Sequence, residues 1–178
     1  MKFRYHTRRD LSAIEDLFVL VFTDTEGETE GALIGNLVKD LILGTDKPDL
    51  SGFVAVDREQ IIGAIFFSRL TFKNECSVFL LAPVAIHSDY QGQGIGQKLI
   101  NHGLREMKGK GVSIVTTYGD RAFYSKVGFR PLSQDVITLP FELSQPEGWL
   151  GQSLVGDVID PIPGRCSPVK AFDNPAYW

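Results

Sequence analysis

The sequence has little of what marks a membrane, secreted or nucleic-acid-binding protein. Its 178 residues contain no apolar run that approaches the ~20 residues of a membrane-spanning helix. The first six residues, MKFRYH, carry charges where a signal peptide needs its apolar region. Two cysteines are too few for a disulfide framework, and a net charge of −4 argues against nucleic acid as the main partner. We therefore expect a cytoplasmic protein with neither a membrane nor a nucleic-acid partner.

Apolar periodicity predicts one mixed α/β domain. Apolar residues recur at helical spacing over residues 11–22 and 33–42, Ser12–Glu15 has the form of a capping box, and Gly44 is placed to end the second helix. Shorter apolar runs predict strands, and a helix of about four turns follows the longest of them. The predicted strands cover residues 3–5, 52–57, 61–67, 77–86 and 112–117, and a further short helix covers residues 120–126. A mixed β-sheet flanked by helices accounts for this order.

The pattern weakens from Pro140 onward. Six of the nine prolines and both tryptophans lie there, which predicts mostly irregular chain. We therefore divide the chain into a domain over residues 1–140 and an irregular extension over 141–178 that packs on it. The aromatic side chains of the extension either pack on the sheet, cover a substrate pocket or form a contact in a homodimer. They are Trp149, Phe172, Tyr177 and Trp178.

The most informative segment is a turn with glycines at positions 92, 94 and 96, between an apolar strand and an amphipathic helix. Glycine lets the backbone approach a ligand closely, and the first N–H groups of a helix have no partner inside it. These amides and the positive end of the helix dipole together favour a phosphate group. The turn therefore predicts a site for a phosphorylated small molecule.

Two familiar phosphate loops fit this turn poorly. A P-loop requires Lys followed by Ser or Thr after its last glycine, whereas Gly96 is followed by Gln97 and Lys98. A dinucleotide-binding turn requires an acidic residue about 20 positions further on. The first carboxylate beyond that distance is Asp120, and the glycine spacing also differs.

The turn instead resembles the acetyl-CoA-binding motif of the GCN5-related N-acetyltransferases, which is Gln or Arg, two residues, Gly, one residue, Gly. The segment Gln91–Gly96 fills that motif, and the preceding Leu81–Ile86 is also similar. A second segment, Gly119–Pro131, resembles the family's aromatic-Tyr, three residues, Gly-Phe pattern. The resemblance covers roughly residues 1–140. It implies the acyltransferase fold with splayed central strands, acetyl-CoA as the acyl donor, and an amine acceptor that is a small molecule or a peptide.

The resemblance also assigns roles to residues. Pro83 lacks an N–H inside a predicted central strand, which indicates a bulge there. In the family, the gap beside this strand admits the pantetheine arm, so the Val84 N–H becomes the candidate donor to the thioester oxygen. Tyr124 matches the position of the general acid, although packing aromatics are also common at such spacing. The residues expected to hold the donor are Val84, Ala85, Ile86, Gln91, Gly92, Gln93, Gly94, Ile95, Gly96 and Gln97.

A general base is not evident. Some family members carry a glutamate on the strand before the turn, and Leu80 occupies that position here. A water chain to a distant acceptor is the interpretation we favour. The three histidines have no metal-ligand spacing, so we expect no metal site. Four carboxylates between the first two helices either attract a cationic amine or stabilise the start of the second helix. They are Asp24, Glu26, Glu28 and Glu30.

Two functions remain open from the sequence. The first is an acetyl-CoA-dependent N-acetyltransferase in which the amine attacks the acetyl group directly. The second is a CoA-binding sensor or interaction module on the same fold that has lost transfer. Leu80 in place of a carboxylate is compatible with the sensor, whereas Tyr124 argues for the enzyme.

Overall fold

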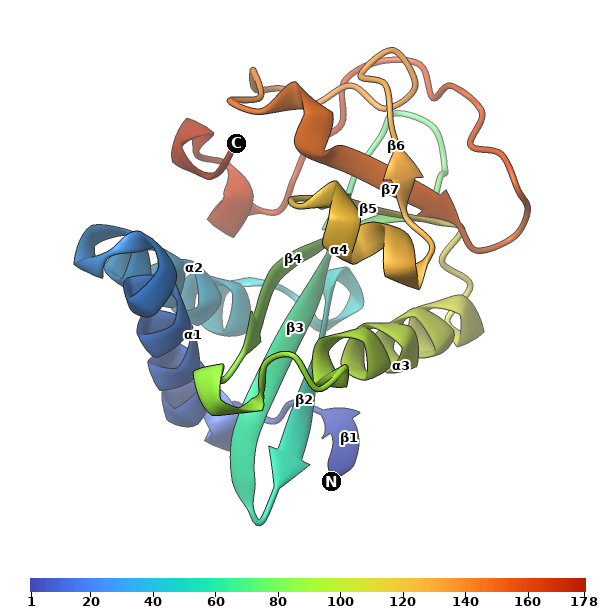
Figure 1. The fold of residues 1–178 in the computed structure, drawn as a ribbon. Coiled ribbons are helices and arrows are strands. Elements are labelled where there is room, and N and C mark those ends of the chain that lie inside the picture. The colour runs from blue at the N-terminus through green and yellow to red at the C-terminus, as the bar shows by residue number, and fades with distance from the viewer. The chain divides into compact units, whose positions relative to one another are not determined.

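A computed structural model describes residues 1–178. Seven strands form one mixed sheet in the order β1-β2-β3-β4-β5-β7-β6, and helices flank it (Figure 1). The contacts divide the chain into two compact units. The first comprises Met1–Phe66 and Pro83–Gly103, and the second comprises Phe67–Ala82 and Leu104–Trp178. No helix combines the length and the apolar character that crossing a membrane requires.

The first unit begins with β1 (Lys2–Tyr5), which pairs antiparallel with β2 (Leu50–Asp57). Strand β3 (Gln60–Leu70) follows β2 after a tight turn in which Arg58 and Glu59 both adopt positive φ. Helices α1 (Leu11–Glu26) and α2 (Glu28–Gly44) lie side by side (Figure 1). The apolar face predicted for α1 is confirmed, because Ile14, Leu17, Phe18 and Val21 are its buried residues.

The predicted capping box at Ser12 and Glu15 is wrong. The reciprocal capping occurs one turn earlier, where the carboxylate of Asp10 accepts the Thr7 amide at 2.7 Å. A bidentate ion pair with Arg4 holds the same carboxylate, with distances of 2.8 and 3.0 Å. Because the Asp10 side chain is engaged with Thr7 and Arg4, a short 3₁₀ turn over Arg8–Asp10 precedes α1 and fixes where it starts.

Close packing of α1 on α2 depends on two glycines. A Cβ atom at Gly31 would overlap Thr23 Oγ1 and lie 2.9 Å from the Val19 carbonyl oxygen, and one at Gly35 would lie 2.5 Å from Val19 Cγ2. Helix backbones this close leave no room for a larger side chain. Glycine therefore sets the distance between the two helices, despite its low helix propensity.

Strand β4 (Val78–Ile86), helix α3 (Ile95–Gly109) and strand β3 each have residues in both units. The buried apolar face of α3 includes Leu99, Ile100, Leu104 and Met107. Within the second unit, β4 pairs in parallel with β5 (Ile114–Tyr118). The paired residues run from Val78 opposite Ile114 to Leu81 opposite Thr117. Beyond that last pair, β4 continues to Ile86.

The second unit also contains α4 (Arg121–Tyr124), β6 (Arg130–Pro131) and β7 (Trp149–Ser153). Most of the chain after Pro140 is irregular, as predicted, but β7 is not. It lies between β5 and β6 and pairs antiparallel with both. The division into a domain over residues 1–140 and an extension over residues 141–178 stays a prediction.

Candidate active site

The glycine-rich turn connects β4 to α3 in the first unit. Gly92 and Gly94 have φ values of +73° and +75°, which side-chain-bearing residues rarely adopt. A Cβ atom at either position would meet no protein atom within 4 Å. Packing against the rest of the chain therefore does not require glycine at these two positions. The positive φ angles are what require glycine here, and open space lies on the side where a Cβ atom would stand.

The turn presents unpaired amides at the start of α3. Lys98 is the first residue whose N–H binds a carbonyl at the helix start, that of Gly94 at 3.1 Å. The amides from Gly92 to Gln97 donate no backbone hydrogen bond, and Gln91–Gly94 are exposed. An amphipathic helix of 15 residues follows, so its dipole adds positive potential at the same place. The turn is therefore built to accept an anionic group through its backbone.

Side chains hold the turn in this shape. Gln91 donates from Nε2 to the Ile86 carbonyl at 2.9 Å, and Gln93 donates from Nε2 to the Asp89 carbonyl at 3.2 Å. Tyr90 donates its phenol proton to Asp57 on β2 at 3.3 Å. Ile86 is one of the residues expected to hold the donor. Its carbonyl already accepts one hydrogen bond, from the Gln91 side chain.

At the end of β4, one edge of the backbone forms a hydrogen bond with β3. The His87 amide donates to the Ile62 carbonyl at 2.8 Å. Because peptide groups alternate along a strand, those of Val84 and Ile86 point to the opposite edge. Both residues are half-buried, whereas Ala85 is buried. The bulge predicted at Pro83 stays a prediction.

Tyr124 lies at the end of α4 in the second unit and is half-buried. Its ring meets Phe123 and Phe129 edge to face, with centroids 5.0 and 5.7 Å apart. A Cβ atom at Gly119 would lie 2.9 Å from Cε2 of the same ring. The pKa of Tyr124 is raised to about 12, and burial is the largest cause. The Asp120 carboxylate raises the pKa further, whereas the Thr117 side chain lowers it, and about 12 is the net result. The phenol is therefore protonated throughout the neutral range.

Asp120 caps α4 by accepting the Ala122 amide at 2.9 Å. No carboxylate replaces the glutamate that is missing at position 80. Leu80 is only 1 % exposed and pairs with Thr116 on β5. Glu75 is exposed in the connection between β3 and β4. Neither position places a carboxylate on β4 where the family's base would stand.

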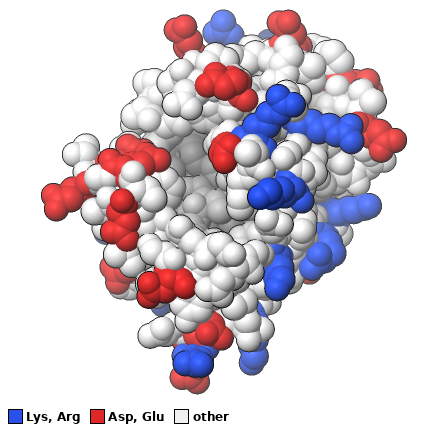
Figure 2. All heavy atoms as spheres, viewed as in Figure 1, with Lys and Arg blue, Asp and Glu red and all other residues white.

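The four carboxylates between α1 and α2 are arranged in two pairs. Glu28 and Glu30 lie in the first turn of α2, where negative charge stabilises a helix. Asp24 and Glu26 lie in the last turn of α1, where the dipole disfavours it. Asp24 also accepts a hydrogen bond from the Ser88 hydroxyl at 3.2 Å. Figure 2 shows acidic side chains gathered over this end of the helix pair, at the left of the view.

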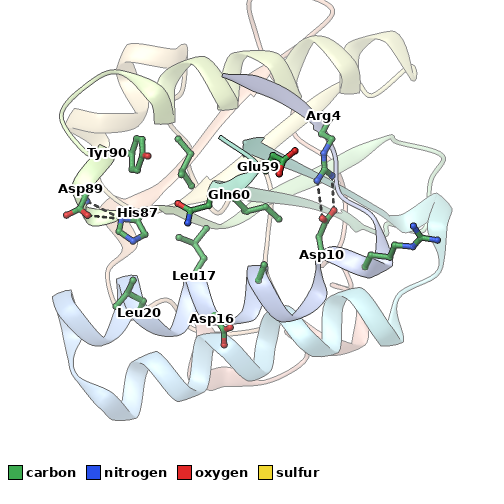
Figure 3. A pocket seen from close by; sticks show the side chains of 14 residues that line it. Arg4, Asp10, Asp16, Leu17, Leu20, Glu59, Gln60, His87, Asp89 and Tyr90 are labelled. Atoms are coloured by element: carbon green, nitrogen blue, oxygen red, sulfur yellow. Dashed lines mark hydrogen bonds and ion pairs between the residues drawn. The ribbon is translucent and has the colours of Figure 1, made fainter. Parts of the chain in front are cut away.

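A cavity of about 600 Å³ lies in the first unit, above α1 in the view of Figure 3 and beside the start of the turn. The Arg4–Asp10 ion pair lies in its wall, together with Asp16, Glu59 and His87. His87 Nδ1 accepts the Asp89 amide at 3.2 Å and lies 3.9 Å from the Asp89 carboxylate. The neutral imidazole therefore carries its proton on Nε2 and cannot act as a base at that atom.

The aromatic residues of the last segment pack on one another within the second unit. Trp149, Phe172 and Trp178 are at most 5 % exposed. The Trp178 ring lies edge to face with Trp149 at 6.4 Å, and its indole N–H donates to the Phe172 carbonyl at 3.0 Å. Of the alternatives for these side chains, packing is the one that the contacts support. The chain contains no group of three or more His, Cys, Asp or Glu side chains arranged to hold a metal ion.

Comparison with known proteins agrees with the motifs. The family profile described as an acetyltransferase (GNAT) domain matches residues 48–131. An uncharacterized N-acetyltransferase of Escherichia coli K12, YjhQ, is 31 % identical over 131 residues, which are 70 % of each chain. The chain belongs to the GCN5-related N-acetyltransferase family. A second uncharacterized N-acetyltransferase of that strain, YhbS, is 35 % identical over 106 residues, which cover 58 % of this chain and 60 % of YhbS.

Solved structures show the same fold. The GNAT-family protein YhbS from Escherichia coli, solved in complex with CoA, aligns with a TM-score of 0.81 at 26 % identity over 97 % of this chain and 92 % of YhbS. A GNAT-family acetyltransferase from Brucella melitensis, solved with acetyl-CoA, aligns with a TM-score of 0.75 at 23 % identity over 97 % of each chain. The fold is therefore that of the acyltransferases in this family.

The predicted site residues fall in both units. Val84–Ile86 and Gln91–Gln97 belong to the first, and Tyr124 belongs to the second. Strand β4 passes from the second unit to the first between Ala82 and Pro83. Sequence reasoning missed Thr117 and Gly119, the two β5-end residues that adjoin Tyr124. A threonine in a strand and a glycine after it are too common to have signalled this role.

Proposed function

We propose that this protein transfers the acetyl group of acetyl-CoA to a primary amine by direct attack in a ternary complex. The observation that carries the proposal is the turn from Gln91 to Gly96. It combines two glycines of positive φ, open space at their Cβ positions and unpaired amides at a helix start. Membership of the family and the CoA and acetyl-CoA bound to the two related structures support the same donor.

The donor would be held mainly by backbone groups. The amides from Gly92 to Gln97 would bind the pyrophosphate, with the side chains of Gln91 and Gln93 supporting the turn. The peptide groups of Val84 and Ile86, with Ala85 between them, would hold the pantetheine arm as an added strand. The Val84 N–H would donate to the thioester oxygen as negative charge develops there.

The chemistry is an acyl transfer. The amine lone pair forms a bond to the acetyl carbon, the C–S bond breaks, and its electron pair remains on sulfur. Tyr124 would donate its phenol proton to that sulfur, which gives CoA as the free thiol. A pKa of about 12 keeps Tyr124 protonated until pH rises well above neutrality. Deprotonation of the free enzyme's phenol therefore does not limit the rate in the usual assay range.

The acceptor nitrogen must lose two protons, one from the ammonium before the attack and one after the N–C bond has formed; one of the two restores the proton that Tyr124 gives to sulfur. An alkyl ammonium has a pKa of about 10, so only a small fraction is neutral at pH 7. With leucine at position 80 and His87 Nε2 protonated, we propose that water carries this proton to solvent. The rate should therefore rise with pH as the free amine becomes more abundant.

A cationic acceptor suits the charges around the end of α1. The helix-dipole argument accounts for Glu28 and Glu30 but not for Asp24 and Glu26. We propose that this exposed group of carboxylates attracts the amine, whether it belongs to a small molecule or a peptide. Neutralising Asp24 and Glu26 together should raise KM for a cationic amine, and the effect should shrink as salt is added.

The test is turnover of acetyl-CoA with a panel of primary amines, followed as thiol release. The parent protein should acetylate at least one amine. Tyr124→Phe should lower kcat by about a hundredfold or more and leave KM for acetyl-CoA nearly unchanged. Tyr118→Phe is the matched control, because the Tyr118 hydroxyl binds Ser144 and the Gln145 amide instead. Equal rates for the parent and Tyr124→Phe would contradict the acid role.

A CoA-binding sensor on the same fold is the second candidate, favoured by Leu80 in place of a carboxylate. Acetyl-CoA binding without turnover on any amine would support the sensor over the enzyme. A homodimer and a cytoplasmic location stay predictions from the sequence.

A further inference from the structure

The cavity of about 600 Å³ in the first unit has a buried apolar floor. Leu17 on α1 and Ile62 on β3 line it and are only 4 % and 1 % exposed. In Figure 3, Leu17 and Gln60 point toward one another from opposite sides of the cavity. Its lining residues all belong to the first unit, and none is among those expected to hold the donor. The volume falls in the usual range for a small-molecule site.

The charged groups around this floor carry an excess of negative charge. The bidentate ion pair in the wall is neutral by itself. The other charged residues of the lining are Asp16, Glu59, Asp89 and Arg9, so three carboxylates remain against one guanidinium group. Asp16 and Glu59 form no ion pair within the chain. The cavity therefore offers negative charge that the protein itself does not neutralise.

The combination of floor and rim selects one class of ligand. Carboxylates on an open surface are solvated and require no partner. Here they border a cavity, and they come from separate elements, since Asp16 lies on α1 and Glu59 lies in the turn between β2 and β3. An aliphatic chain would cover Leu17 and Ile62, and ammonium groups, which only donate hydrogen bonds, would meet the carboxylates. A di- or polyamine has both parts.

The cavity also adjoins the glycine-rich turn. Asp89 and Tyr90 line it and lead directly into Gln91, and Gln93 donates from Nε2 to the Asp89 carbonyl at 3.2 Å. The Asp89 carboxylate places a negative charge beside the amides proposed to bind pyrophosphate, which opposes an anionic donor. A cation in the cavity would offset that charge. Linkage then requires each ligand to raise the affinity for the other by the same factor.

We propose that this cavity binds an aliphatic di- or polyamine, an effector that strengthens binding of the anionic donor. The amine site rests on the cavity and its lining, whereas its effect on the donor rests on the proposed function. The lining does not include Asp24 or Glu26, the carboxylates proposed to attract the acceptor. No covalent bond forms or breaks at this site.

The most direct variant is Leu20→Lys, which tethers an ammonium group at the cavity. Leu20 lines the cavity and is 42 % exposed, so we expect the longer side chain to leave the fold intact. Leu43→Lys is the matched control, because Leu43 lies on α2, is 45 % exposed and does not line the cavity.

A second pair of variants removes charge instead of adding it. Asp16→Asn combined with Glu59→Gln takes two carboxylates from the cavity. Asp40→Asn combined with Asp46→Asn changes the net charge equally at exposed positions of the first unit that lie outside it. These four proteins and the parent separate binding in the cavity from general attraction to an acidic protein.

Calorimetric titration with spermidine tests the site. The parent and the two control proteins should bind it with a submillimolar dissociation constant. Leu20→Lys and the Asp16→Asn, Glu59→Gln protein should bind it about tenfold more weakly or worse. Magnesium chloride at equal ionic strength has no aliphatic body and should not displace spermidine. No binding by the folded parent, or equal binding by Leu20→Lys and Leu43→Lys, would overturn the site.

Titration with acetyl-CoA tests the effector role. Saturating spermidine should raise the parent's affinity for acetyl-CoA by about twofold to fivefold at low salt. The Asp16→Asn, Glu59→Gln protein should lose this effect, which direct pairing of spermidine with CoA would not predict. Leu20→Lys should bind acetyl-CoA more tightly than Leu43→Lys without spermidine. Spermidine binding that leaves acetyl-CoA affinity unchanged would overturn the effector role. The spermidine titration needs neither acetyl-CoA nor turnover, so it decides the site even if the proposed function fails.

Discussion

Gln91 donates from its side-chain amide to the carbonyl oxygen of Ile86, over a distance of 2.9 Å. The bond joins the first residue of the glycine-rich turn to the last residue of β4. The family motif accepts Gln or Arg at this position, and both carry an N–H donor at the end of a long side chain. The motif therefore encodes a structural bond that shapes the turn, besides the glycines that line it.

This relationship predicts the effect of changing Gln91. Gln91→Ala should weaken acetyl-CoA binding by about fivefold to tenfold, because the loss of a hydrogen bond worth about 1 kcal/mol loosens the turn. Gln91→Arg retains a donor and should bind nearly as well as the parent. Calorimetric titration of the three proteins checks both expectations. Equal affinity for Gln91→Ala and the parent would show that the turn keeps its shape without this bond.

The Arg4–Asp10 pair should make stability depend on pH in the acid range. Its hydrogen bonds lower the pKa of Asp10 from 3.8 to about 2. A carboxylate whose pKa is lower in the folded state stabilises the fold above its unfolded pKa and loses that effect as pH falls toward the folded value. Because Arg4 is 41 % exposed, we expect a contribution of about 1 kcal/mol at neutral pH rather than the full amount that the shift implies.

Asp10→Asn should therefore lower the free energy of unfolding by about 1 kcal/mol at pH 7, and the difference from the parent should shrink between about pH 4 and pH 2. Urea unfolding at several pH values measures it. Asp40→Asn, at an exposed position on α2, is the control and should stay close to the parent. A difference for Asp10→Asn that persisted undiminished at the lowest pH would contradict the assigned ion pair.

The contact between α1 and α2 predicts opposite outcomes for two glycines of the same helix. Gly31→Ala should destabilise the protein by about 1–3 kcal/mol, because the added methyl group meets backbone atoms of α1. Gly44→Ala places its methyl group where no atom lies within 4 Å, and we expect a change of about 0.5 kcal/mol or less. Thermal and urea unfolding of both variants tests this. A stable Gly31→Ala protein would mean that the helices separate without cost.

The helices and most strands could be predicted because their information is local. Ile14, Leu17 and Phe18 recur at helical spacing, and each is buried. The glycine-rich turn was equally readable, since its glycines stand at positions 92 and 94 where the backbone has positive φ. In these segments, neighbouring residues alone determine the conformation.

The failures have a common physical cause, which is partners distant in sequence. Strand β7 contains Gly151 and follows Pro146, and its strand character comes from pairing with β5 on one side and β6 on the other. The start of α1 depends on Arg4 holding Asp10, which a four-residue motif does not reveal.

The most direct test of the account is calorimetric titration with acetyl-CoA of the parent, Gly94→Glu and Gly164→Glu. Gly94 and Gly164 both have positive φ and open space at the Cβ position, so the two variants share the same backbone strain. Only Gly94→Glu places a side chain and a negative charge in the predicted pyrophosphate site. We predict micromolar binding by the parent and by Gly164→Glu and none by Gly94→Glu. A folded parent protein that does not bind acetyl-CoA, or a Gly94→Glu variant that binds it equally well, would contradict the central claim.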